Sequence, residues 1–509
     1  MDYFLLFSRI SIPVNIKEGE ICIIANREFV LDKYTKPNFC GLPTAAELRQ
    51  ALIDGEGSDV RRQLDILFDS GTFVETAAFT KRGVSDFLNT DKTCEFEGVI
   101  CGYGAIDGKL VFAFAEDASR MGGAIDDRHA KKICDLYKLA ISNAAPVIGI
   151  FNSNGTDIFE GAGALSAYGR IISAVSKASG VIPQIAFVTG KCIGTCSAIC
   201  SMFDIVVKSS DAVLYVSSPV ITGKEGAQDA IVTYSGSIDS CAAYIRSVVS
   251  FIPSNSSVGI LVSDICADNL NRKLGNIDFG GDALSAISVI ADAGLFYEFS
   301  RDYAPEVSTV LTSLGGVKCG IVATSFGVNE GRISQAAARK IARFVNFLDS
   351  FSIPVVTLVD SLGLSVDGAD EELFAPELAK LAFAYATATC PKVTVIMGHA
   401  IGASFVLLGS KSLGADLVYA IDSSEIGALP AESSVAFAWD RYITEEKTRE
   451  ELISEWKCSV SSPSAAASSG DIDDIIGTNE LRARLCSALL MLSAKGDASG
   501  VARRKVLPL

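Results

Sequence analysis

The sequence predicts an α/β protein built from two fused copies of one strand-and-helix unit. Three observations support this fold class. The chain has 509 residues, which is too many for one ordinary core and suits two domains of about 250 residues. A long stretch repeats itself at a constant offset, and amphipathic helices alternate with apolar strands in both copies.

The repeat is clearest between residues 130–155 and 338–363. AKKICDLYKLAISNAAPVIGIFNSNG lies over ARKIARFVNFLDSFSIPVVTLVDSLG with eight identities in 26 positions, and the offset is 338 − 130 = 208. The same offset aligns PQIAFVTGKCIGTCS, which begins at Pro183, with PKVTVIMGHAIGASF, which begins at Pro391. Two blocks that share one register indicate a duplication.

Each copy predicts the same order of elements. In the first copy, residues 132–141 form an amphipathic helix, 146–155 a strand ending at a glycine turn, and 162–178 a second helix. A buried strand at 185–188 leads into a glycine-rich turn and a helix that begins near Gly194. Strands that alternate with helices predict a largely parallel sheet covered by helices.

The duplication also predicts the domain boundaries. We place the N-terminal domain at 59–265 and the C-terminal domain at 266–509, because RRQLDILFDSGTFVE resembles SAISVIADAGLFYEF ahead of the best-matched blocks. Residues 1–58 have no counterpart and form an extension without an assigned role. The Ser/Ala-rich residues 459–470 fit either a linker or a small-residue helix packed on a neighbour.

Composition excludes several partners. The net charge is −16 and the longest basic run is 503–505, so nucleic acid is not expected.

Fourteen cysteines without a signal peptide indicate a reducing cytoplasm. Cys192, Cys196 and Cys200 are spaced by four, which fits an apolar helical stripe better than a zinc site, and no metal is predicted. Residues 393–410 lack formal charge but fit a buried strand, turn and helix better than a membrane span.

Two glycine turns are the first candidates for chemistry. The second strand of each copy runs into G-x-x-x-G and then a helix, at Gly190–Gly194 and Gly398–Gly402. Backbone N–H groups at such a turn can point at one oxygen, and the helix dipole favours negative charge there. The turns could therefore be two oxyanion holes, or simply tight turns that need glycine for backbone geometry. Spacing alone leaves both interpretations open.

Side chains suited to acid–base catalysis are scarce. The only histidines are His129, at a helix start, and His399, directly before the second glycine turn. For both, a structural or ligand-positioning role is favoured over general-base catalysis. No G-x-S-x-G, H-E-x-x-H or Walker A motif is present. Chemistry that relies on backbone donors therefore suits the chain best.

A further set of motifs runs from about residue 61 to the end of the chain. Together they resemble the acyl-CoA carboxyltransferase family, which includes carboxyltransferase subunits of biotin-dependent propionyl-CoA carboxylase β and methylmalonyl-CoA decarboxylase α type. The resemblance implies tandem duplicated crotonase-like (ClpP/crotonase) domains. The motifs are GVICGYGAIDGKLVFAFAED (98–117), MGGAIDDRHAKKIC (121–134), EGAGALSAYGRI (160–171), SGVIPQI (179–185), KIARFVNFLDSFSIPVVTLVD (340–360), GADLVYAIDSSEIGAL (414–429), GDIDDII (470–476) and the terminal LPL.

The resemblance implies a carboxyltransferase that moves a carboxyl group between biotin and the α-carbon of an acyl-CoA. The N-terminal domain would hold acyl-CoA, with coenzyme A as part of the substrate. The C-terminal domain of another subunit would hold biotin, carried on a separate carrier protein or domain. The enolate and ureido oxyanions would be held by backbone amides. The resemblance implies Gly194, Thr195, Gly402 and Ala403 as catalytic residues, and Gly122, Gly123, Gly155, Gly363, Ser404 and Val406 as substrate-binding residues.

The same resemblance implies several partners. These are a biotin carboxyl carrier protein, either a biotin carboxylase subunit or membrane decarboxylase subunits, and further copies of the chain in a dimer-based homo-oligomer, a hexamer. The expected location is the cytoplasm, either free or peripheral to a membrane complex.

Two departures from the family pattern keep an alternative open. Thr195 stands where the family has a second glycine, and Asp157 stands where it has an arginine. They motivate a non-catalytic, scaffolding homologue of the same subunit as the second hypothesis. A third, a crotonase-type hydratase or hydrolase, needs a Glu or His beside the N-terminal turn, and none is convincingly placed.

Overall fold

The computed structural model describes residues 14–17, 20–23, 44–54, 58–81, 96–223, 229–263, 266, 268–274, 282–365, 371–444 and 447–495. The chain divides into two compact units, Met1–Asp54 and Gly55–Leu509. In the first unit, β1 (Val14–Lys17) pairs antiparallel with β2 (Glu20–Ile23), and α1 spans Ala45–Asp54. The predicted domain boundary at 265/266 adjoins residues outside the described ranges and stays a prediction.

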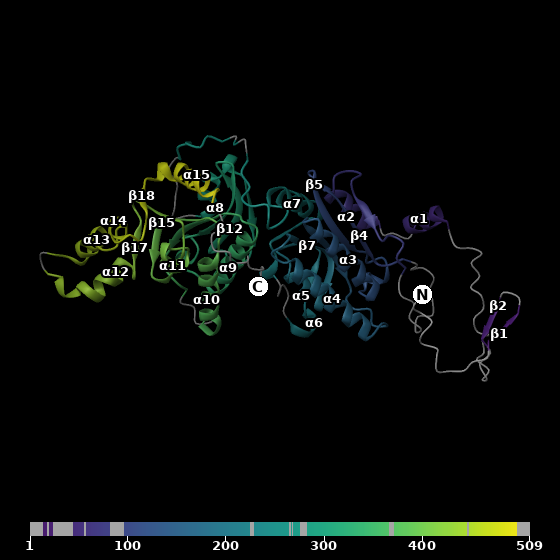
Figure 1. The fold of residues 1–509 in the computed structure, drawn as a ribbon. Helices are drawn as coiled ribbons and strands as arrows, with labels where there is room; N and C mark the ends of the chain where they lie inside the picture. The colour runs from purple at the N-terminus through teal and green to yellow at the C-terminus, as the bar shows by residue number, and fades with distance from the viewer. Residues whose placement is uncertain are drawn as a thin grey trace. The chain divides into compact units, whose positions relative to one another are not determined.

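The second unit contains two eight-stranded sheets with the same topology. Figure 1 labels β4, β5 and β7 of the first sheet and β12, β15 and β17 of the second. The first has the order β10-β8-β7-β6-β5-β4-β3 with β9 on β7, and the second β11-β12-β13-β14-β15-β16-β18 with β17 on β15. The first sheet comprises β3 (Val74–Thr76), β4 (Val99–Ile106), β5 (Lys109–Glu116), β6 (Val147–Ser153), β7 (Gln184–Ile193), β8 (Ile205–Ser209), β9 (Val213–Tyr215) and β10 (Tyr234–Gly236). The second comprises β11 (Phe296–Phe299), β12 (Val307–Leu314), β13 (Val317–Thr324), β14 (Val355–Ser361), β15 (Lys392–Ile401), β16 (Leu417–Ile421), β17 (Glu425–Gly427) and β18 (Asp474–Ile476).

The helices confirm the predicted alternation, and equivalent helices begin at equivalent caps. Asp126 accepts the His129 N–H at 2.7 Å at the start of α3, and Ser334, 208 residues later, caps α9 in the same way. The first half contains α2 (Ser58–Leu67), α3 (Asp127–Ser142), α4 (Ala162–Ala178), α5 (Thr195–Ser201), α6 (Pro219–Thr222) and α7 (Ile238–Phe251). The second contains α8 (Ala283–Ile290), α9 (Gln335–Ser350), α10 (Glu371–Thr387), α11 (Ala403–Leu407), α12 (Ala431–Ser434), α13 (Arg449–Ser459), α14 (Pro463–Ser469) and α15 (Leu481–Leu492).

Irregularities in the two sheets repeat at the same offset, which confirms the duplication. The β6–β7 register shifts between Phe151 and Ser153, and the β14–β15 register shifts between Val359 and Ser361. A shift at the end of a strand re-aims the residues that follow it. Each half therefore carries the same distorted strand end where the glycine turns lie.

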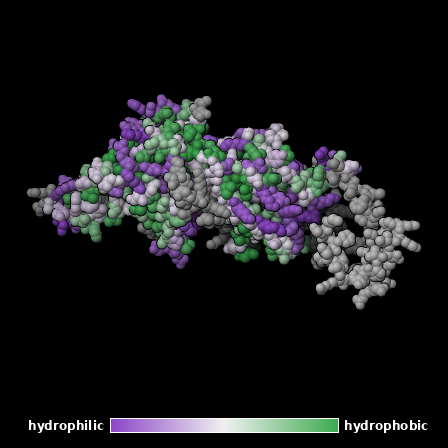
Figure 2. All heavy atoms as spheres, viewed as in Figure 1, coloured by the Kyte–Doolittle hydropathy of each residue, from purple (hydrophilic) through white to green (hydrophobic). Residues whose placement is uncertain are grey.

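Segments with more than one interpretation are resolved. The uncharged residues 393–410 form the buried strand β15 and helix α11, and the Ser/Ala-rich residues 459–470 contain the helix α14. No helix in the described part of the chain is long and apolar enough to cross a membrane. Figure 2 shows polar and apolar side chains mixed over the face in view.

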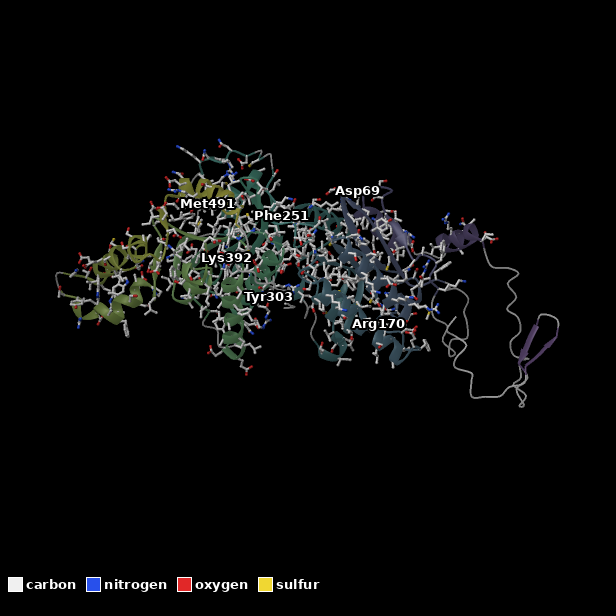
Figure 3. All side chains as sticks on the ribbon, in the orientation of Figure 1. Asp69, Arg170, Phe251, Tyr303, Lys392 and Met491 are labelled. Carbon is white, nitrogen blue, oxygen red and sulfur yellow. The ribbon has the colours of Figure 1, made fainter. Side chains whose placement is uncertain are left out.

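Backbone carbonyl oxygens at the end of α7 accept hydrogen bonds from both halves of the second unit. Lys109 Nζ, from the first half, donates to the Val249, Ser250 and Ile252 oxygens at 2.9–3.0 Å. Lys318 Nζ, from the second half, donates to Ser250 and to Phe251, which Figure 3 labels, at 3.0 and 2.9 Å. The last carbonyls of a helix lack intrahelical donors, so two lysines stabilise this end.

Replacing Lys318 with Met should destabilise the second unit. The carbonyls of Ser250 and Phe251 lose charged donors, which are worth about 1.5–3 kcal/mol each before Lys109 and water compensate. We expect the free energy of urea unfolding to fall by about 2 kcal/mol. The control is K138M, because the Lys138 side chain is 75% exposed and its pair with Asp135 lies on the surface. Equal losses in both variants would contradict this account.

Candidate functional site

Both predicted glycine turns have the same backbone conformation. Gly194, between β7 and α5, has φ 63° and ψ −130°, and Gly402, between β15 and α11, has φ 59° and ψ −129°. Residues with a Cβ rarely adopt this combination, so glycine is required at both positions. Each strand therefore turns sharply into a short helix at the same edge of its sheet.

In each turn, the glycine N–H is bonded within the fold, and the N–H of the next residue has no acceptor within its helix. Gly194 donates to the Tyr215 oxygen of β9 at 3.0 Å, and Gly402 donates to the Gly427 oxygen of β17 at 2.8 Å. Thr195 and Ala403 are the first residues of their helices, where an N–H has no intrahelical acceptor. In both turns glycine sets the conformation and its N–H is bonded within the fold, while the catalytic role of Gly194, Thr195, Gly402 and Ala403 stays a prediction.

A second glycine loop lies beside each turn. Gly155 (φ 105°) follows β6, and its N–H is accepted by Ser153 Oγ at 3.0 Å. Gly363 (φ 112°) follows β14, with Ser361 Oγ in the same role at 3.2 Å. A Cβ on Gly363 would lie 3.4 Å from the Ile401 oxygen. The structure thus brings the predicted residues Gly155 and Gly363 next to the turns.

Gly122 and Gly123 pack against the end of β6. The Gly122 oxygen accepts the Asn154 N–H at 2.9 Å, and a Cβ on Gly123 would lie 2.5 Å from the Asn152 oxygen. A side chain at Gly123 would therefore push the loop away from the strand. Both predicted residues border the Gly155 loop, and close packing explains the need for glycine at position 123.

Asn152 and Asp360, which we call the hub residues, were missed in the sequence. Asn152 donates its N–H to Glu116 Oε2 at 2.8 Å and accepts the Lys191 N–H on Oδ1 at 3.2 Å. Asp360 donates its N–H to Thr324 Oγ1 at 2.6 Å and accepts the His399 N–H on Oδ1 at 2.8 Å. These pairs are related by the 208-residue offset, and that offset is the signal that could have found them.

The hub residues explain the first glycine of each G-x-x-x-G. A Cβ on Gly190 would lie 2.1 Å from Asn152 Oδ1, and a Cβ on Gly398 would lie 2.5 Å from Asp360 Oδ1. The hub side chain fills the space that a Cβ would need. Gly190 and Gly398 are therefore required by a close approach of side chain to backbone, and Gly194 and Gly402 by conformation.

The two histidines lie in different environments. His399 is half-buried, with Nδ1 2.9 Å from Asp360 Oδ1 and its ring stacked on Phe326 at 4.9 Å. The hydrogen bond with Asp360 raises the pKa of His399 above its ordinary value. His129 is fully buried in α3, with ring nitrogens 3.7 Å from Glu97 and 3.9 Å from Glu116. Burial raises the pKa of Glu116 to about 7.

Val406 and Ser404 were both predicted to bind substrate, and the structure separates them. Val406 is exposed and lines a cavity of about 540 Å³ beside Gly402. Ser404 is fully buried, and its hydroxyl donates to the Ile401 oxygen at 2.9 Å. Ser404 therefore supports the turn, and its contact with a ligand stays a prediction. The other residues lining the cavity are Phe405, Ile426, Gly427, Ala428, Val460, Ala465, Ala466, Ser469 and Asp471.

Thr195 and Asp157, the departures from the family pattern, also have clear positions. Thr195 is exposed at the start of α5. Asp157 is buried, and its Oδ1 accepts the Phe159 N–H at 3.0 Å. Neither substitution disturbs the backbone of the turn, because Gly194 and Gly402 share one conformation.

The cysteines at the first turn lie in its core. Cys192 Sγ is 3.4 Å from Cys196 Sγ and 3.3 Å from Cys200 Sγ, and all three side chains are fully buried. Burial raises the pKa of the Cys200 thiol. Every cysteine in the described ranges is a free thiol, and within those ranges no group of ligands is arranged to hold a metal ion.

Comparison with known proteins places this arrangement in one family. A family model described as carboxyl transferase domain matches residues 56–506. The chain belongs to the carboxyl transferase domain family. It is 33% identical over 477 residues to methylmalonyl-CoA decarboxylase subunit alpha of Veillonella parvula, covering 88% of this chain and 92% of that protein. It is 32% identical to the propionyl-CoA carboxylase beta chain of Cereibacter sphaeroides, covering 88% and 93%.

A solved structure confirms the fold of this carboxyl transferase family member. The transcarboxylase 12S crystal structure, described as a hexamer assembly with methylmalonyl-coenzyme A and methylmalonic acid bound, has a TM-score of 0.82 and 29% identity. The match covers 91% of this chain and 98% of that one. The predictions of a carboxyltransferase and of duplicated crotonase-like α/β domains are confirmed.

Replacing Glu116 with Gln tests the buried acid behind the first turn. Its carboxyl pKa rises from 4.5 to about 7 on folding, so between these pH values the folded chain keeps a proton that the unfolded chain releases. The stabilising contribution is therefore present below pH 4.5 and lost as pH rises through 7. The free energy of unfolding of the parent chain should fall by about 3 kcal/mol over this pH range, and that of E116Q should not show this fall.

The measurement is chemical unfolding of both proteins between pH 4.5 and 8. Gln keeps an acceptor for the Asn152 N–H, and the unfolding free energies should converge at the acidic end, where Glu116 is neutral in both states. A constant difference across this range would contradict the shifted pKa.

Proposed function

We propose that the chain transfers a carboxyl group between biotin, carried on a separate protein or domain, and the α-carbon of an acyl-CoA. The observation that carries the proposal is the pair of equivalent turns. Each presents an N–H, from Thr195 or Ala403, at the start of a helix beside a glycine loop. A transfer that develops negative charge on one oxygen of each substrate needs one such donor position per substrate.

In the N-terminal half, the thioester oxygen of acyl-CoA would accept the Thr195 N–H. Removal of the α-proton gives an enolate whose negative charge lies on that oxygen, so the donor stabilises the reacting state more than the bound substrate. The Thr195 side chain is exposed at the turn and can contact the acyl group. Gly155 leaves the neighbouring backbone open to close approach.

In the C-terminal half, the cavity of about 540 Å³ fits the fused rings of biotin. Its walls are mainly apolar, with Phe405 and Val406 on one side and the small residues of α14 on another. The Ala403 N–H has no acceptor within its own helix and would donate a hydrogen bond to the ureido oxygen. Bound biotin would supply the carboxyl group and a basic ureido centre.

The partners of the proposed reaction are a biotin carrier and either a biotin carboxylase or membrane decarboxylase subunits. The relatives named above are an alpha subunit and a beta chain, so proteins of this kind work within complexes. Large apolar side chains of this chain are exposed, with Val220 at 94% and Phe437 at 88%. Exposed apolar surface favours burial against other subunits, which supports a homo-oligomer like the 12S hexamer.

The scaffolding alternative is weakened by the surroundings of Asp157. Its carboxylate is buried and holds the Phe159 N–H, so it adds no exposed negative charge to the acyl-CoA turn. Thr195 keeps its N–H. Both departures are therefore compatible with a working donor position.

Proline at the first helical residue tests each donor separately. Thr195→Pro and Ala403→Pro remove one N–H, while the fixed φ of proline suits the first turn of a helix. Loss of one oxyanion donor should lower kcat about 100-fold or more. The assay follows release of CO2 from malonyl- or methylmalonyl-CoA with free biotin by the purified chain.

The matched controls are Thr195→Ser and Ala403→Ser, which keep the N–H and should stay within about threefold of the parent chain. Equal activity in the Pro and Ser variants would overturn the assigned donors. A parent chain that is inactive with several acyl-CoAs would favour the scaffolding homologue.

A further inference from the structure

His399 and Asp360 form a pair that the proposed transfer leaves without a role. The Asp360 carboxylate oxygen accepts the His399 backbone N–H at 2.8 Å and lies 2.9 Å from ring Nδ1. This carboxylate fixes the proton on Nδ1, and Phe326 fixes the plane of the ring. Nε2 is thus the nitrogen left to meet a ligand, on a side chain that is 35% exposed.

The first half presents a cation at the equivalent position. Lys191 lies 208 residues before His399, its side chain is exposed, and its N–H is held by the hub residue Asn152. In each copy, the residue whose N–H the hub accepts therefore has a side chain that can carry a positive charge. In the second copy the hub is itself an acid, which favours the protonated ring.

Charged groups from three further elements face this pair. Glu425 of β17 pairs with His399 through the backbone, and Glu432 of α12 and Lys457 of α13 lie nearby. Lys457 Nζ is 3.4 Å from Glu425 and 3.1 Å from Glu432, so these two carboxylates share one ammonium group. Asp360 remains the carboxylate in direct contact with the ring.

The pair and the cavity are built on the same elements of the fold. β17 contributes Glu425 to the charged group and Ile426 to the cavity wall. Lys457 lies on α13, and Val460, directly after this helix, lines the same cavity. The β15 strand carries His399 three residues before the Gly402 turn. Asp360 raises the pKa of this imidazole, which favours its cationic form on the strand that leads into the turn.

We propose that His399, oriented by Asp360, binds a negatively charged oxygen of the ligand in the C-terminal half, namely the carboxylate that is being transferred. This inference rests on the proposed function. His399 would contact the carboxylate through Nε2–H, and Asp360 would be a positioning residue. A hydrogen bond of this kind between charged groups is stronger than a neutral one.

The first test uses the scarcity of histidine. The chain has two, and His129 is fully buried, so diethyl pyrocarbonate should modify one histidine per folded chain. Free biotin with malonyl-CoA should slow this modification. H399A should remove the reactive site, while carboxyl transfer by the modified parent chain should fall with the extent of modification. Modification without loss of transfer would overturn the proposal.

The second test uses kinetics. In the direction from carboxybiotin to acyl-CoA, H399A should lower kcat/KM for carboxybiotin, the carboxyl donor, roughly 10- to 100-fold at neutral pH, with the KM for the acyl-CoA acceptor unchanged. In the parent chain, transfer should fall as pH rises through the raised pKa of His399. H399K keeps a cation, so it should restore transfer and move this decline to higher pH. Lys191→Gln, the matched change in the other copy, should leave the KM for the carboxyl donor unchanged.

The outcomes separate this inference from the proposed function. An active parent chain whose pH profile is unchanged in H399A overturns the role of His399 alone. An inactive parent chain overturns the proposed function and this inference with it. Thermal unfolding of H399A and H399K shows whether either variant fails to fold, and D360N then provides the second measurement, because it should weaken donor binding while His399 is retained.

Discussion

The hub residues hold the rest of the site in place. Asn152 and Asp360 stand at distorted strand ends. Each donates its N–H to the neighbouring strand, and its carbonyl oxygen and side chain lie against glycines of two different loops. One loop reaches the hub through Gly123 or Gly331 and the other through Gly190 or Gly398. Because a Cβ at any of these glycines would clash, hub and glycines form one packing unit.

This arrangement separates conformation from chemistry. Gly194 and Gly402 use their own N–H groups to hold β9 and β17, so the donor positions pass to Thr195 and Ala403. Nothing in that donor depends on a titratable side chain, which explains why a chain with two histidines can support oxyanion chemistry.

Sequence reasoning predicted what depends on periodicity and repetition. The helix at 162–178 has the predicted bounds, and both turns occur where the spacing placed them. It could not predict that Gly194 and Gly402 would be bonded to β9 and β17, because strands of three residues carry no periodic signal. The inward position of Ser404 has the same origin, since burial depends on which segments cover the turn.

The two copies show how duplication can yield two different sites on one backbone. The glycines that the backbone requires are the same in both copies, whereas the residues around them differ. Glu116 corresponds to Thr324, Asn152 to Asp360 and Lys191 to His399. The acidic side chain thus lies behind the hub in the first copy, where Glu116 is buried beside His129, and at the hub itself in the second. A hub carboxylate can orient an imidazole and raise its pKa, whereas a hub amide beside Lys191 cannot. The shared fold therefore supplies equivalent turns, and the charged groups around the two hubs differ.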